Sequence, residues 1–107
     1  SVWAKIIPQS GGGYFFSVSS GHGLSHQPTV NGAIQYFNST TQFNTPNKLR
    51  DYSAWYHIVF TAVSGSHARV YTNGVTVVNN YSMSVNNFGG SSVTNRIGAW
   101  HSSSSLY

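Results

Sequence analysis

The sequence predicts an all-β fold, either a sandwich or a barrel, and three observations indicate it. Val, Ile and Thr number 24 against three Leu, one Met and no Glu, and β-branched residues suit a pleated, half-buried sheet. Short apolar segments alternate with Gly, Asn, Ser and Pro, a spacing typical of sandwiches and barrels. A chain of 107 residues has room for one hydrophobic core.

Each expected strand is rich in β-branched or aromatic residues and is bounded by turn-forming residues. In chain order the expected strands are 2–7, 14–19, 33–38, 41–43, 55–63, 67–72, 75–79 and 93–99, with 82–85 left open. The glycine-containing segment 21–26 and the Asn- and Pro-containing segment 44–47 are expected to be loops.

The clearest local pattern is the pair Asn73-Gly74, which stands between two β-branched runs. Both residues tolerate a positive φ angle, and a two-residue turn of this kind matches the twist of the strands that it joins. We therefore predict a β-hairpin made by residues 67–72 and 75–79.

Residues 55–63 carry apolar side chains at both odd and even positions. A strand with this pattern is expected to be covered on both faces. One cover would be the sandwich core, and the other a loop, a further sheet or another chain.

Charged side chains are scarce, because five Lys or Arg residues and one Asp give a net charge of +4. Ser, Thr and Asn together number 36, so uncharged hydroxyl and amide groups form the polar surface. Such a surface suits an extracellular protein or a subunit of an assembly. The five cations are scattered along the chain, so we expect no nucleic-acid partner.

Apolar runs reach only three or four residues, far below the ~20 needed to cross a bilayer, so we expect no membrane insertion. The absence of Cys excludes disulfides, thiolate metal sites and a Cys nucleophile. The chain begins with Ser1 and has no signal-peptide pattern. We expect residues 1–107 to be a single domain and a piece of a longer chain.

Candidate metal ligands and catalytic residues are few. His22 and His26 are four residues apart, a spacing that aligns two ligands on a helix but not in a glycine-containing loop. We interpret them as surface residues and predict no metal site. No Gly-x-Ser-x-Gly motif supports a Ser-His-Asp hydrolase, and Asp51 is interpreted as a turn residue.

The composition favours carbohydrate binding, because sugars need exposed aromatic faces together with amide and hydroxyl groups. The candidate binding residues, in or near the expected loops, are Trp100, His101, Tyr52, Tyr36, His22, His26 and Asn47. The alternative is that these aromatic residues pack in the core or against neighbouring subunits.

Four segments occur in the order of a known family. They are Val2-Trp3-Ala4-Lys5, Trp55-Tyr56-His57-Ile58-Val59, Val70-Tyr71-Thr72-Asn73-Gly74 and Arg96-Ile97-Gly98. An aromatic before Lys or Arg, a Trp-x-His strand, an Asn-Gly hairpin and a closing Ile-Gly strand resemble the laminin-G-like domains of the concanavalin A-like lectin/glucanase superfamily.

The resemblance implies a two-sheet jelly roll, with the first and last strands of the family pattern missing from this chain. It implies structural roles for Trp55, His57, Tyr71, Asn73, Gly74, Ile97 and Gly98. The ring of His57 is expected to be hydrogen-bonded near the core. Core contacts are expected from Trp3, Trp55, Val59, Phe60, Val70, Tyr71 and Ile97.

The resemblance also bears on chemistry. The glucanases of the superfamily need two carboxylates, and Asp51 is the only acidic side chain, so we expect no enzyme and no catalytic residue. Some laminin-G-like domains bind calcium through oxygen ligands. With one Asp, this chain could hold calcium only weakly, and no other cofactor is expected.

The uncharged, Ser- and Asn-rich composition further resembles laminin-G-like modules in tail fibres, head fibres and capsid decorations of tailed bacterial viruses. The leading hypothesis is a structural or adhesion module located on a virion or outside the cell. Its partners would be other copies, neighbouring virion proteins or a cell-surface glycan. The alternative is a secreted carbohydrate-binding module or lectin.

Overall fold

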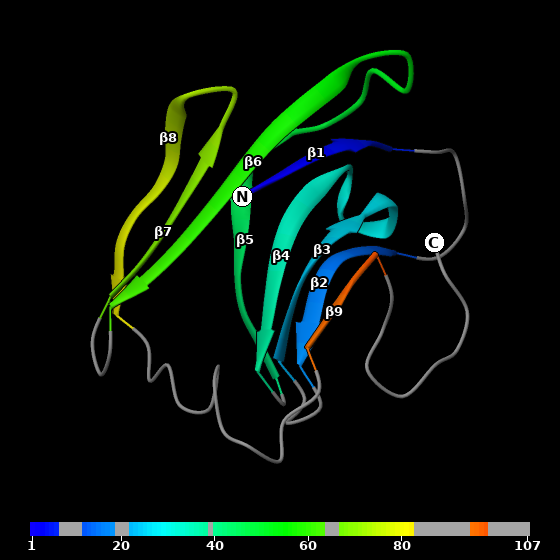
Figure 1. Ribbon diagram of the computed structural model, residues 1–107. Coiled ribbons are helices and arrows are strands. Elements are labelled where there is room, and N and C mark those ends of the chain that lie inside the picture. Colours follow the sequence, from blue (N-terminus) through cyan, green and yellow to red (C-terminus); the bar gives the residue numbers. More distant parts are fainter. Residues whose placement is uncertain (7–11, 19–21, 39, 64–66, 83–94, 99–107) are drawn as a thin grey trace.

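A computed structural model describes residues 1–6, 12–18, 22–38, 40–63, 67–82 and 95–98, which form two antiparallel β-sheets packed face to face (Figure 1). The first sheet has the order β1-β6-β7-β8, made by Val2–Lys5, Trp55–Val63, His67–Thr72 and Val75–Ser82. The second has the order β5-β4-β3-β2-β9, made by Thr40–Lys48, Ala33–Asn38, His22–Gln27, Gly13–Val18 and Asn95–Ile97. A 3-10 turn, η1 (Pro28–Val30), joins β3 to β4. The predicted two-sheet antiparallel sandwich is confirmed.

Most predicted strands are present, and β4, β6 and β7 have the predicted bounds. Residues 22–26 of the segment expected to be a loop (21–26) instead belong to β3, the central strand of the second sheet. A Cβ at Gly23 would lie 3.1 Å from the ring of Tyr14, so the glycine permits a close approach and does not end the strand.

The expected loop at 44–47 is likewise wrong, because these residues continue strand β5. Pro46 lies within this strand, where it cannot donate a backbone hydrogen bond. β5 is at the edge of its sheet, and edge strands are where Pro is tolerated. The segment 83–85 of the strand left open lies outside the described residues.

The core lies between the two sheets and is dominated by large side chains from the central strands. Leu24, Ile34 and Tyr36 of the second sheet are at most 1% exposed, and so are Ile58 and Val70 of the first. The Tyr36 ring stacks on Phe60 of the opposite sheet, with 5.2 Å between ring centroids. Aromatic contacts therefore help to hold the two layers together.

The predicted Asn-Gly hairpin is confirmed. Asn73 and Gly74 have φ angles of 51° and 79°, and Thr72 pairs with Val75 across the turn. The Asn73 Oδ1 atom accepts a 2.8 Å hydrogen bond from the backbone N–H of His57. The Asn73 N–H donates a 2.8 Å hydrogen bond to the backbone carbonyl of His57, so the turn is bonded to β6.

Three residues expected in the core are on the surface. Trp3 is 64% exposed, Trp55 61% and Ile97 77%. Side chains alternate along a strand, and Ile58 of β6 is buried, so Trp55, three residues earlier, faces outward. β1 alternates in the same way, with Val2, Ala4 and Ile6 inward. Of the other expected core residues, Val70 is buried, whereas Val59, Phe60 and Tyr71 are partly buried.

Among the described residues, no helix has the length and hydropathy of a membrane-spanning segment.

Candidate ligand-binding surfaces

Three of the expected sugar-binding residues are buried and cannot form an exposed platform. Tyr36 is 0% exposed, His22 5% and His26 3%. The His22 Nδ1 atom is 3.1 Å from the hydroxyl oxygen of Tyr36. Burial raises the pKa of the Tyr36 phenol, which therefore stays protonated, and lowers the pKa of His22. These two side chains are an internal polar pair of the second sheet.

His26, like His22, is a buried residue of β3, and it lies two residues beyond Leu24. Its Nε2 atom lies 3.3 Å from the Leu49 carbonyl oxygen, and because a carbonyl can only accept, Nε2 carries the proton. Burial lowers the pKa of His26, and the bond to Leu49 opposes this shift. Side chains four apart on a strand share a face but stand roughly 13 Å apart, so His22 and His26 cannot hold one metal ion.

The remaining expected sugar-binding residues are dispersed. Tyr52 is 44% exposed in the turn between β5 and β6, and Asn47 is exposed near the end of β5. Trp100 and His101 lie outside the described residues. In the described part of the chain, the expected sugar-binding residues therefore do not form one exposed site.

A different aromatic surface is formed on the outer side of the first sheet. We call it the tryptophan face and define it by Trp3 of β1 and Trp55 and His57 of β6. Trp3 pairs in register with His57, and the rings stack with centroids 4.8 Å apart and an interplanar angle of 21°. Trp55 is the diagonal neighbour of Trp3, a position roughly 7–8 Å away in an antiparallel pair.

The role expected for His57 is therefore wrong in part. Its ring stacks on Trp3 at the outer face instead of forming a hydrogen bond near the core. Its structural contribution comes from the backbone, which exchanges two hydrogen bonds with Asn73. The Trp-x-His sequence thus places two aromatic rings on the same outer side of β6, because the spacing of two residues preserves the face of a strand.

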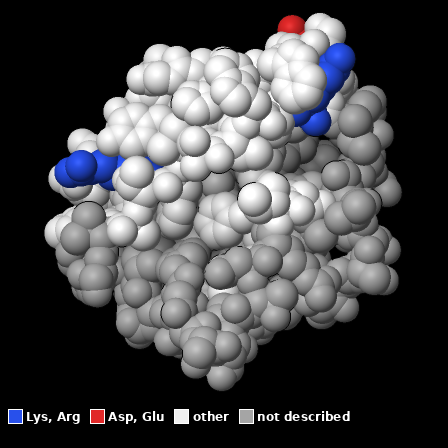
Figure 2. Space-filling model, in the orientation of Figure 1, with Lys and Arg blue, Asp and Glu red and all other residues white. Residues whose placement is uncertain are grey.

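The single acidic side chain lies in a turn. The Asp51 Oδ1 atom accepts hydrogen bonds from the Ser53 hydroxyl at 2.6 Å and the Ser53 N–H at 2.8 Å. These bonds, with a smaller contribution from Lys5, hold the pKa of the Asp51 carboxyl below its usual value. The view in Figure 2 has cationic side chains at two separate places, one of them beside the acidic group.

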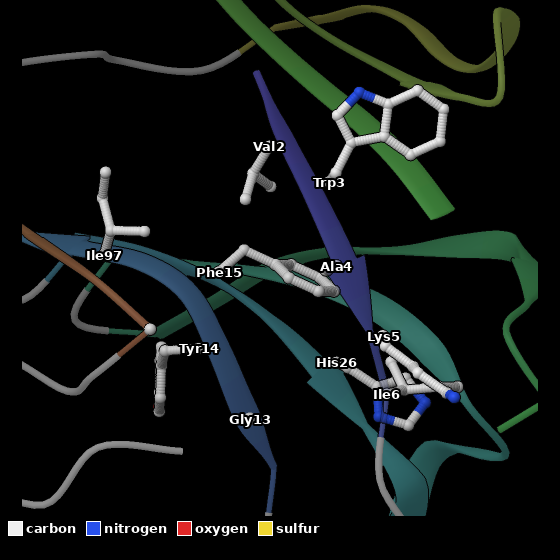
Figure 3. Close-up of a pocket in the computed structure, with 11 residues that line it drawn as sticks. Val2, Trp3, Ala4, Lys5, Ile6, Gly13, Tyr14, Phe15, His26 and Ile97 are labelled. Carbon is white, nitrogen blue, oxygen red and sulfur yellow. The ribbon is translucent and has the colours of Figure 1, made fainter. Parts of the chain in front are cut away.

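A cleft lies between the two sheets beside β1, with a volume of about 280 Å³ (Figure 3). Its walls come from β1 of the first sheet and from β2, β3 and the end of β9 of the second. Trp3 projects from the other side of the β1 ribbon, away from Val2 and Ile97. The tryptophan face and the cleft are therefore separate surfaces that share β1.

Comparison with protein families finds a match that spans nearly the whole chain. The model described as the concanavalin A-like lectin/glucanases superfamily matches residues 1–106. Searches of curated proteins and of solved structures each return no match. The matched range contains both sheets, the tryptophan face and the cleft.

Proposed function

The chain belongs to the concanavalin A-like lectin/glucanases superfamily, and from this premise we propose that it is a non-enzymatic adhesion module that binds glycan through the tryptophan face. Members of this superfamily often bind carbohydrate or mediate adhesion. The finer assignment depends on which surface of this chain suits a sugar and on whether the chain has the groups needed to cleave one.

The main observation that supports this proposal is the exposure of two tryptophans on neighbouring strands of one sheet. An indole ring offers a flat apolar surface to the C–H face of a sugar and an N–H donor to its hydroxyls. Leaving a large apolar side chain in water forgoes roughly 1.5–3 kcal/mol of burial free energy. A ligand that covers both rings would recover part of that free energy.

The sheet also restricts the motion of the aromatic rings. Trp3 is supported by its stacking contact with His57, and Trp55 lies on a nine-residue strand that is paired on both sides. Groups that are already fixed before binding lose little conformational entropy when a ligand arrives. Such a rigid surface favours recognition of an extended saccharide.

The near absence of carboxylate side chains supports binding without hydrolysis. Glycoside hydrolysis usually needs two carboxylates that flank the bond, and Asp51 is the only carboxylate side chain in the sequence. It caps a turn through Ser53 instead of facing a substrate cleft. Weak calcium binding stays a prediction, and the described residues contain no cluster of three His, Asp or Glu.

We propose an extracellular setting, on a virion or as a secreted module, because the surface is polar and nearly uncharged. The hypothesis that the chain is a subunit of a virion assembly gives the tryptophan face another possible occupant, a neighbouring subunit. Sedimentation distinguishes these occupants, because an interface produces concentration-dependent association whereas a free binding face leaves the chain monomeric.

The proposal is tested on a glycan array with the wild-type chain and the variants Trp3→Ala and Trp55→Ala. We expect selective binding that each variant weakens at least about tenfold, which corresponds to about 1.4 kcal/mol. Both residues are largely exposed, so the variants should keep the wild-type fold.

The matched control is Val75→Ala, which removes an equally exposed apolar side chain at the far edge of the same sheet. It should bind as the wild type does. Equal binding by all three variants would place the site elsewhere. Silence across the array, combined with self-association that Trp55→Ala abolishes, would replace the glycan with a second subunit.

A further inference from the structure

A cation lies directly beside the tryptophan face. Lys5 of β1 is exposed and pairs in register with Trp55 of β6. Alternation along β1 places Lys5 on the same outer side as Trp3, and opposite residues of an antiparallel pair have Cβ atoms about 4.5–5.5 Å apart. The Lys ammonium group stands on a flexible four-carbon stem. It can therefore reach a ligand that lies on the indole rings.

A second cation, Arg69 of β7, lies on the same outer side of the sheet. Its neighbours Ala68 and Val70 are buried, so the exposed Arg69 side chain points away from the core. Arg69 pairs with Thr61, which lies six residues beyond Trp55 on β6. At about 3.3 Å per residue, the two cationic positions are roughly 20 Å apart along the strand direction.

The contact that Arg69 makes within the protein leaves its charge uncompensated. The Nε atom and one terminal nitrogen donate to the Asn80 Oδ1 atom at 3.0 and 2.8 Å. This amide oxygen is neutral, and a guanidinium group has five N–H donors, so donors remain for a ligand. The contact also restricts the motion of the side chain, which lowers the entropy that a ligand must remove.

The side chains between the two cations are aromatic or apolar. Val59 and Tyr71 form a cross-strand pair, and Val59 lies two residues beyond His57 on the same face of β6. We call this longer surface the basic strip and define it by Lys5, the tryptophan face, Tyr71 and Arg69. It offers flat apolar area in the middle and positive charge toward both ends.

Competition from carboxylates of the protein is weak. Asp51 is the only acidic side chain in the sequence, and it lies in the turn before β6. Its strongest interactions are with Ser53, and the attraction to Lys5 is the smallest contribution to its lowered pKa. Exposed ion pairs contribute little free energy, so Lys5 can pair with an anion of a ligand.

We propose that the basic strip binds negatively charged saccharides in preference to neutral ones. Sugar rings lie on the indole rings of the tryptophan face, and carboxylate or sulfate groups pair with Lys5 and Arg69. The proposal rests on the proposed function, because it names the class of glycan that the tryptophan face binds. A neutral saccharide would stack on the same rings but would leave both cations without an anionic partner.

A single-stranded nucleic acid also combines stacking with negative charge, but the strip suits it less well. Its phosphates follow one another at every nucleotide, and proteins that bind it track them with a continuous positively charged groove. The strip has two cations roughly 20 Å apart with aromatic and apolar side chains between them. Widely spaced anions on an extended saccharide match this arrangement better.

The test compares ligands that differ only in charge, by isothermal titration of the full chain. The first pair is an oligogalacturonate hexasaccharide and its methyl ester, and the second is dextran sulfate and dextran. We expect the hexasaccharide to bind about tenfold more tightly than its ester, which corresponds to about 1.4 kcal/mol shared between two exposed ion pairs. Added salt should reduce this preference by screening. Comparison of the two charged ligands distinguishes carboxylate from sulfate recognition.

Three variants locate the charge effect. Lys5→Met and Arg69→Met each remove one cation at an exposed position, so the fold should persist, and each should weaken binding of the charged hexasaccharide about threefold. The matched control is Lys48→Met, which removes the same charge from β5 of the second sheet. It should bind the hexasaccharide as the wild type does.

The outcomes separate this proposal from the proposed function. Equal affinity for the hexasaccharide and its ester, with both weakened by Trp55→Ala, would overturn charge selection and leave glycan binding by the tryptophan face intact. Charged-ligand binding that Trp55→Ala does not weaken would overturn both. Equal losses in Lys5→Met and Lys48→Met, tighter binding of oligo(dT) than of the hexasaccharide, or no binding of either charged saccharide would overturn the present proposal.

Discussion

Replacing Leu24 with Ala tests whether this residue lies on a core strand or in the loop that Gly21 and Gly23 indicated. Leu24 is 1% exposed at the middle of β3 and pairs in register with Tyr36. Leu-to-Ala changes in cores cost about 2–5 kcal/mol, more where the surroundings cannot collapse into the cavity. His22 and His26 are each fixed by a hydrogen bond, so we expect a loss of about 3–4 kcal/mol.

The measurement is urea unfolding followed by tryptophan fluorescence, with the slope of the transition checked for constancy. Domains of this size have stabilities of about 5–15 kcal/mol, so the variant should remain folded in water, with a midpoint far below that of the wild type. Val75→Ala, on an exposed side chain, should change stability by less than about 0.5 kcal/mol. A loss under about 1 kcal/mol for Leu24→Ala would refute the placement of β3 in the core.

Two further predictions concern pH and the hairpin. Burial lowers the pKa of His22 and His26 below 6.5, so the unfolded chain takes up protons that the folded chain does not. Stability should therefore be complete above pH 6.5 and fall as the pH drops toward the folded-state pKa values; urea midpoints that stay level between pH 8 and pH 5 would contradict this. Gly74→Val should cost about 1–3 kcal/mol because of the φ angle of 79°, not because of crowding, since a Cβ there meets no atom within 4 Å. Gly74→Asn should cost less in the same unfolding assay, and equal stability of the Val variant and the wild type would contradict the hairpin geometry.

Features set by neighbouring residues could be predicted from the sequence. The hairpin depends on the φ preferences of Asn73 and Gly74, and both residues have positive φ angles in the structure. The all-β class followed from composition, and the strand at 55–63 followed from its long run of β-forming residues. These properties do not require knowledge of which segments pack together.

Features that depend on distant contacts were predicted less well. Gly23 was interpreted as a loop residue, whereas it makes room for Tyr14 from the adjacent strand. Pro46 indicated a loop because the sequence does not reveal that β5 would be an edge strand. In both cases the structural role of the residue depends on the position of its strand in the sheet, which the sequence does not show.

The candidate site was missed for a related reason. Trp55 and Ile58 lie on opposite faces of β6, and both are apolar, so the sequence alone could not determine which face is buried. Alternation along β1 offered a signal, because Val2 and Ala4 share a face that excludes Trp3. The pairing of Trp3 with His57 then required the register of two strands far apart in the chain.

The most direct test of the central claim is an NMR titration that follows the indole N–H signals of the three tryptophans while an array-selected glycan is added. The account predicts that the signals of Trp3 and Trp55 shift together and saturate. Shifts confined to Trp100, with Trp3 and Trp55 unaffected, would contradict the claim that the tryptophan face binds the glycan.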